Sequence, residues 1–130
     1  MKMTLVDVIN RQRILATLAD KKLPYKLGYA IAKNVAKFQA EAEIIEKSRK
    51  SLIENYAVKD DKGEPVVEDN QYKIEEEKMA EFNAEFSDYM STETDVEIFT
   101  VPESVLDADD SRFDVLTVAQ IFALDFMIEK

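Results

Sequence analysis

A long series of apolar residues, spaced alternately four and three positions apart, constrains the fold of this chain more than any other feature. The series occupies these positions: Leu27, Ile31, Val35, Phe38, Ala42, Ile45, Arg49, Leu52 and Tyr56. A period of 3.5 residues is typical of a helix that packs along one seam, and Arg49 is the one charged member of this seam. We therefore predict a helix over 26–57, which at 1.5 Å per residue would be about 48 Å long.

This helix is longer than a compact domain of 130 residues is wide, since such a domain has a radius of gyration of about 14 Å. Either the helix kinks, or the molecule is elongated, or a second copy covers the part of the seam left bare. We favour elongation, followed by self-association. The bare part would include Ile45, Leu52 and Tyr56.

Capping residues mark the first and last of the other helices. Thr4 begins a predicted helix over 4–20 and Thr117 begins one over 117–129, each with a side chain three residues later that completes a capping box. The last helix is apolar almost all round, so we expect it to be buried in the core. Asp125 lies inside that apolar stretch and would then need a hydrogen-bonding or charged partner.

Turn-forming residues after the long helix precede segments with strand character. We predict short strands at 65–67 and 72–74 that form a hairpin, a helix over 75–90, and a strand over 95–101 that pairs with the hairpin. The expected architecture is a single domain over 1–130 of the α+β class, mostly helical. It combines a long helical hairpin, a small antiparallel β-sheet and a buried C-terminal helix.

The charge of the chain is divided between its two parts. Residues 1–57 carry eleven basic and six acidic side chains, whereas residues 58–130 carry six basic and 21 acidic ones, so the net charges are +5 and −15. Either the two parts neutralise each other across the fold, or an acidic face stays exposed for a basic partner. The candidate face consists of Asp60, Asp61, Glu64, Glu68, Asp69, Glu75, Glu76, Glu77, Glu81, Glu85 and Asp88.

The residue types missing from the chain exclude several kinds of site. Cys, His and Trp are absent and there are two glycines, which excludes disulfides, Cys/His zinc sites, His-containing triads and glycine-rich phosphate loops. Asp107, Asp109 and Asp110 do not fit a calcium-binding EF-hand loop, because Arg112 and Val118 stand where Gly and Glu are required. We therefore predict no enzymatic activity, no metal and no cofactor.

Membrane insertion and direct nucleic-acid binding are not expected. No apolar run approaches the roughly 20 residues of a membrane span, and charged residues interrupt the N-terminal segment where a signal peptide would have its apolar core. Several lysines between residues 21 and 37 are available for phosphates, but the net charge of −10 opposes that contact. We expect a soluble protein whose partner is another protein.

Four stretches of the chain together resemble one known family. They are KKLPYKLGYAIAKNVAK at 21–37, ENYAVKDDKGEPVVEDNQYKI at 54–74, DVEIFTV at 95–101 and LTVAQIFALDFMIE at 116–129. The chain resembles the small bacteriophage and prophage proteins of Gram-positive hosts grouped as domain of unknown function 1617. The resemblance implies a phage gene product that acts in the bacterial host cytoplasm or in the virion, and it transfers no catalytic residue.

Two hypotheses about function follow. In the first, the chain is a non-enzymatic protein-interaction module whose carboxylates imitate phosphates and inhibit a host nucleic-acid-binding or defence protein. In the second, it is a virion structural or assembly accessory protein that forms a homo-oligomer through its long helix. The seam residues would then make the contact: Ile31, Val35, Phe38, Ile45, Leu52 and Tyr56.

Overall fold

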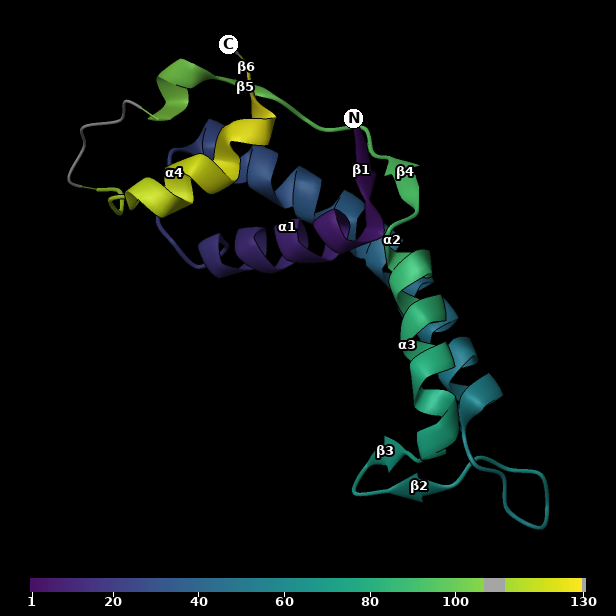
Figure 1. The fold of residues 1–130 in the computed structure, drawn as a ribbon. Helices are drawn as coiled ribbons and strands as arrows, with labels where there is room; N and C mark the ends of the chain where they lie inside the picture. Colours follow the sequence, from purple (N-terminus) through teal and green to yellow (C-terminus); the bar gives the residue numbers. More distant parts are fainter. Residues whose placement is uncertain (107–111, 130) are drawn as a thin grey trace.

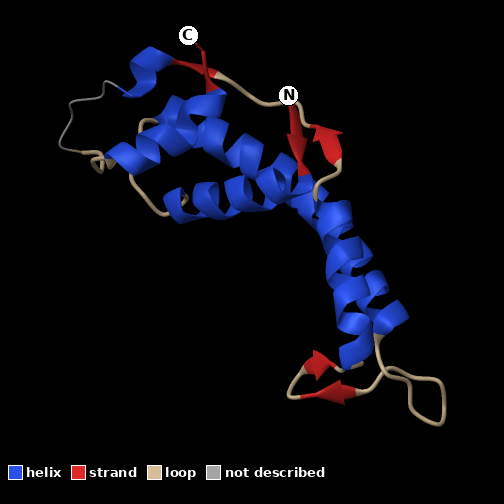
Figure 2. Ribbon diagram, viewed as in Figure 1, coloured by secondary structure: helices blue, strands red, loops and turns tan. Residues whose placement is uncertain are grey.

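The computed structural model describes residues 1–106 and 112–129, which fold mostly into helices (Figures 1 and 2). Asp107, Asp109 and Asp110 lie outside the described residues. The helices are α1 (Leu5–Leu18), α2 (Tyr25–Tyr56), α3 (Glu76–Met90) and α4 (Val118–Leu124), with short 3-10 helices η1 (Glu103–Leu106) and η2 (Asp125–Met127). The strands are β1 (Lys2–Thr4), β2 (Val67–Glu68), β3 (Gln71–Tyr72), β4 (Glu93–Asp95), β5 (Val101–Pro102) and β6 (Ile128–Glu129). The mostly helical α+β class and the α1–α2 hairpin are as predicted.

Helix α2, 32 residues long, is the axis of an elongated molecule (Figure 1). Its first half packs with α1 and α4 in a body that we call the head, which comprises residues 1–40, 93–106 and 112–129. Its second half packs against α3 in a two-helix stalk, made of residues 41–56 and 76–92. Residues 57–75, which include the β2–β3 hairpin, form the tip at the far end of the stalk.

The hydrophobic core lies mainly in the head. Helix α1 starts at the predicted capping box, in which Thr4 Oγ1 accepts from the backbone N–H of Asp7 and the Asp7 carboxylate accepts from the N–H of Thr4. The largest fully buried apolar side chains come from α1, α2 and the C-terminal segment: Val8, Leu15, Leu18, Leu27, Phe38, Leu124 and Met127. Each stabilises the fold by about 1.5–3 kcal/mol relative to exposure, so these contacts hold α1 and α4 on α2.

The strands pair differently from the sequence prediction, which joined 95–101 to the hairpin. Strand β4 pairs antiparallel with β1, β5 pairs parallel with β6, and β2 pairs with β3. The reason is the path of the chain: α3 returns along α2 from the tip, so 95–101 lies in the head while the hairpin stays at the opposite end of the stalk (Figure 1).

The prediction of a buried C-terminal helix is also wrong. Helix α4 ends at Leu124 and is followed by η2 and β6, and Leu124 is its one fully buried residue. Phe122 is 75 % exposed, and Asp125 lies on the surface rather than in the core. Because α4 rests on the outside of the head, one side of this all-round apolar helix meets the core and the other meets solvent.

Candidate protein-interaction surfaces

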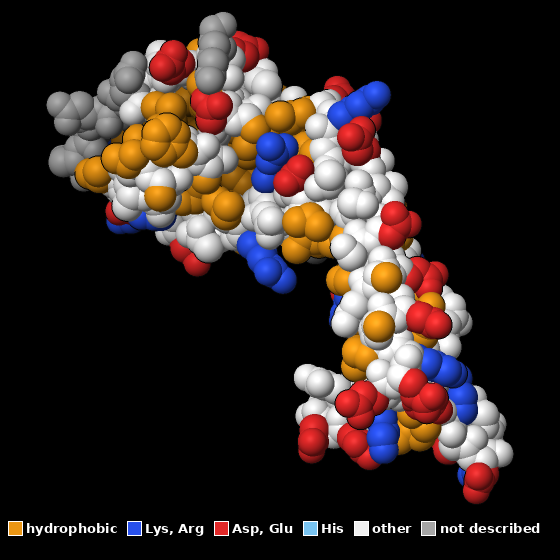
Figure 3. Space-filling model, in the orientation of Figure 1, with side chains coloured by type: hydrophobic (Ala, Val, Ile, Leu, Met, Phe, Trp, Pro, Cys, Tyr) orange, Lys and Arg blue, Asp and Glu red, His pale blue; other side chains and the backbone are white. Residues whose placement is uncertain are grey.

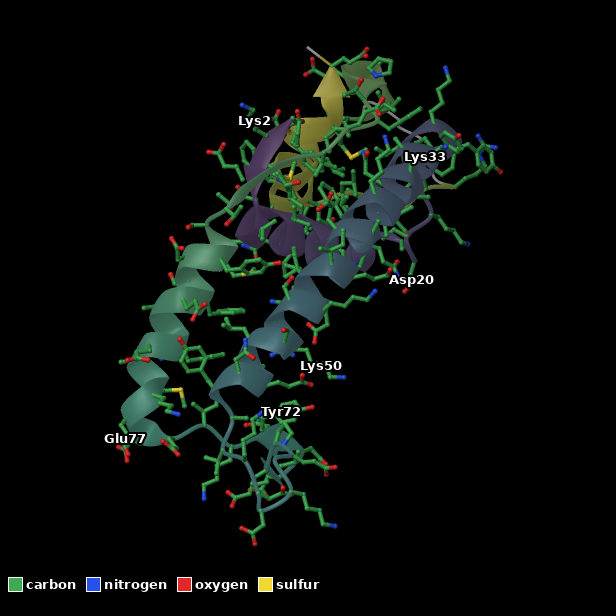
Figure 4. The ribbon with its side chains drawn as sticks, turned by 90° about the vertical axis from the view of Figure 1, so that its right-hand side faces the viewer. Lys2, Asp20, Lys33, Lys50, Tyr72 and Glu77 are labelled. Atoms are coloured by element: carbon green, nitrogen blue, oxygen red, sulfur yellow. The ribbon has the colours of Figure 1, made fainter. Side chains whose placement is uncertain are left out.

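All eleven carboxylates of the predicted acidic face are exposed, and all lie on the tip and stalk. Figure 4 shows Glu77 at the tip end of α3, and Figure 3 shows acidic side chains gathered at that end of the molecule. Along α3, Glu77, Glu81 and Glu85 follow one another at four-residue spacing, which places them about 6 Å apart along one ridge. We call the eleven residues the acidic face.

Local backbone geometry fixes the carboxylates of the tip. Asp60 Oδ1 accepts from the backbone N–H groups two and four residues later, which closes a turn where Gly63 has φ 79°. In the β2–β3 hairpin, Asp69 and Asn70 have φ 51° and 64°, as a two-residue type I′ turn requires. Asp and Asn tolerate this left-handed conformation better than most residues, so the turn accommodates Asp69 at its apex.

Few of these charges are neutralised. Lys73 Nζ lies 3.5 Å from Glu68, and Lys78 Nζ lies 4.0 Å from Glu75, in two exposed ion pairs within the tip and the start of α3. Exposed pairs of this kind contribute little to stability. Among residues 1–106 and 112–129, none of the eleven carboxylates forms an ion pair with a lysine or arginine of residues 1–57. Direct ion pairing between the two parts of the chain therefore does not neutralise these eleven carboxylates.

An aromatic ladder holds the acidic helix α3 against α2. Tyr56 Oη donates to Glu85 Oε2 at 2.5 Å, and this hydrogen bond is the main reason why the pKa of Tyr56 is raised. The Tyr56 ring meets Phe82 edge-on at 5.9 Å, and Phe82 stacks on Phe86 at 6.0 Å. These contacts fix the rotation of α3, so Glu85 reaches across to α2 while Glu81 stays exposed to solvent.

The seam of α2 is largely covered by other parts of the same chain. In its first part Ile31 and Phe38 are buried and Val35 is half-buried against the head. Ile45 is only 4 % exposed, so the prediction that it stays uncovered is wrong. Farther along, the seam is half-buried beneath α3, at Leu52 and Tyr56.

The described part of the chain offers no group of three or more acidic side chains arranged to hold a metal ion. Within the same residues, no helix has the length and apolarity needed to cross a membrane. Comparisons with protein-family models, curated proteins and solved structures give no match to this chain.

Asn34, a fully buried polar residue of α2, was not among the residues predicted from the sequence to matter. Its side-chain amide donates to the carbonyl oxygen of Phe99 at 2.9 Å and accepts from the N–H of Phe99 at 2.8 Å. Its Nδ2 also lies 3.5 Å from Met127 Sδ. Its burial could have been predicted from its position four residues after Ala30 and four before Phe38, which places it on the buried side of the helix.

Proposed function

We propose that this chain is a non-enzymatic, phage-encoded protein-interaction module that uses its acidic face to occupy a basic surface of a host nucleic-acid-binding or defence protein. One observation carries the proposal: eleven exposed carboxylates cover one end of an elongated molecule, with no ion pair to the basic residues 1–57. The resemblance to small phage proteins supports a phage origin and action inside the infected bacterium.

The shape and charge of the stalk support the proposal that it imitates a nucleic-acid backbone. Helix α3 is a rod of about 22 Å whose ridge of carboxylates repeats every 6 Å or so. A basic channel that binds phosphates would attract such a rod, chiefly by raising the association rate, and salt would weaken the attraction. The head would stay outside the channel, because the acidic face lies at the opposite end of α2 (Figure 1).

The alternative function, a virion assembly protein that self-associates through the long helix, has less support. It needs an apolar seam that is free to meet a second copy. Phe38 and Ile45 of that seam are buried within the chain itself. The covered seam therefore favours the interaction module over assembly through α2.

Affinity capture from a Gram-positive host lysate tests the proposal when two matched variants are compared. The stalk variant combines Glu76→Gln, Glu77→Gln, Glu81→Gln and Asp88→Asn. The head variant combines Asp20→Asn, Glu93→Gln, Glu97→Gln and Glu103→Gln, and both variants change the net charge from −10 to −6. Glu85 is left unchanged because it accepts the hydrogen bond of Tyr56.

We expect the wild type and the head variant to capture the same basic protein, and the stalk variant to lose it. Since the acidic face imitates phosphates, double-stranded DNA added as a competitor should release the captured protein. The proposal fails if the stalk and head variants capture the same proteins equally well, or if DNA releases nothing.

A further inference from the structure

The outer side of α4 is an exposed apolar surface on the head. Val115 is 87 % exposed, Val118 69 %, Ile121 38 % and Phe122 75 %. Ile121 and Phe122 follow Val118 by three and four residues, which places these three side chains on one side of α4. Val115 lies in the loop that leads into the helix. Figure 3 shows hydrophobic side chains gathered on this side of the head. We call these four residues the α4 face.

The α4 face has the composition of the centre of a protein interface. Helix α4, with the sequence VAQIFAL, contains no charged residue, and its Ala119 is exposed beside the four large side chains. Centres of interfaces are depleted of charge and enriched in aromatic residues, whereas a surface that only meets water is usually interrupted by charges. The stability of the head does not explain these side chains, because they face away from the core.

We propose that the α4 face is the contact surface of a homodimer, in which the α4 helices of two copies pack together about a two-fold axis. Such an axis places a surface against its own copy, so an uncharged face meets an uncharged face. The four side chains expose on the order of 500 Å² of surface. A pair of faces would therefore bury at most about 1,000 Å², at the lower limit of specific interfaces, which corresponds to a weak dimer.

The charge distribution permits this pairing in spite of the net charge of −10. The acidic face lies on the tip and stalk, whereas α4 lies on the head (Figure 1), and salt screens charges that are more than about 8 Å apart. Asp114 lies at the border of the α4 face, where its Oδ2 accepts the backbone N–H of Lys22 at 2.8 Å. The four side chains of the α4 face carry no charge, so repulsion between two copies is confined to the border of the contact.

A dimer formed through α4 would leave both stalks free. This consequence, unlike the dimer itself, rests on the proposed function: two acidic faces in one particle would bind a partner with two basic surfaces far more tightly than one does. The two proposals can fail separately, because the acidic face and the α4 face share no residue.

Sedimentation velocity on the full chain, from about 5 to about 500 µM, tests the dimer. We expect the wild type to shift from monomer to dimer over this range, with an association that about 0.5 M NaCl does not weaken, because the contact is apolar. The double variant Val118→Glu and Phe122→Glu should weaken association at least tenfold. Val118→Ser with Phe122→Ser, which adds no charge, should weaken it in the same direction.

Ile44→Glu is the matched control, because Ile44 is 59 % exposed on α2, away from the α4 face. This variant should dimerise as the wild type does, and circular dichroism should show unchanged helix content in every variant. A wild type that stays monomeric up to about 500 µM overturns the proposal. Dimerisation that is as strong in both α4 double variants as in the wild type also overturns the proposal. The stalk variant described above should still dimerise, which separates this test from that of the acidic face.

Discussion

Asn34 binds both backbone polar groups of Phe99, a residue 65 positions later in the chain: Nδ2 donates to the Phe99 carbonyl at 2.9 Å and Oδ1 accepts from the Phe99 N–H at 2.8 Å. Residues 96–100 form no strand between β4 and β5, so this side chain supplies hydrogen bonds that a neighbouring strand would otherwise make. The amide thus attaches the returning chain to α2 inside the head.

Replacement of Asn34 should therefore destabilise the whole head. Asn34→Leu is similar in size but cannot pair with the Phe99 backbone, and we expect it to lower the free energy of unfolding by about 2–3 kcal/mol. Urea unfolding followed by circular dichroism measures the change. Asn83→Leu, on the exposed side of α3, is the control and should change stability by less than about 0.5 kcal/mol. An Asn34→Leu protein as stable as the control would show that the pairing is unimportant.

The stalk should open more readily than the head. Helix α3 contains no fully buried residue, whereas α1 buries Leu5, Val8, Leu15 and Leu18. Opening of α3 therefore exposes little apolar surface, and we expect its amide hydrogens to exchange at least about tenfold faster than those of α1. Hydrogen exchange followed by mass spectrometry measures both helices at once, and equal protection of α1 and α3 would contradict this prediction.

Truncation of an aromatic side chain should destabilise the protein more in the head than in the stalk. Phe38 is fully buried and Phe82 is half-buried, so Phe38→Ala should cost about 3–5 kcal/mol and Phe82→Ala about 1–2 kcal/mol of unfolding free energy. Urea unfolding of the two variants gives the comparison. A larger loss for Phe82→Ala would mean that the stalk, and not the head, determines global stability.

The Tyr56–Glu85 hydrogen bond should be visible in the titration of the phenol. The bond holds the neutral phenol against a carboxylate, which raises the pKa of Tyr56 above its ordinary value in the folded state. This contribution to stability is fully present below the pKa of the unfolded chain and is lost as the pH rises through the raised folded pKa. Carbon NMR of labelled tyrosine side chains, assigned with Tyr56→Phe, measures the titration. Glu85→Gln should lower the pKa of Tyr56, and an unchanged titration would show that the bond does not form in solution.

The type I′ turn at the tip should depend on backbone conformation. Asn70 has φ 64°, which a β-branched residue adopts only with strain, so Asn70→Val should disrupt the hairpin while Asn70→Gly preserves it. The register places Val67 opposite Tyr72, and a nuclear Overhauser effect between these residues reports pairing. We expect the effect to be present in Asn70→Gly and absent in Asn70→Val. Its persistence in both variants would show that the turn does not determine the register.

The candidate surfaces were only partly predictable. The sequence contains the eleven carboxylates, and their number alone implies that most are exposed. Whether basic side chains of residues 1–57 pair with them depends on the tertiary structure, in which Lys47 lies on the stalk with Glu85 but forms no ion pair with it. The α4 face could not be predicted, because a helix that is apolar all round gives no indication of which side meets the core.

Local sequence signals were enough to predict three of the four helices. The capping box of α1, the 3.5-residue repeat of α2 and the apolar spacing of α3 act within a few positions of one another, and the predicted bounds lie within one or two residues of the observed ones. The strand partners, the end of α4 at Leu124, its exposure and the role of Asn34 emerged with the tertiary structure. Each of these depends on contacts between residues far apart in the chain, such as Val101 and Ile128, and such contacts exist only after α3 has carried the chain back along α2 to the head.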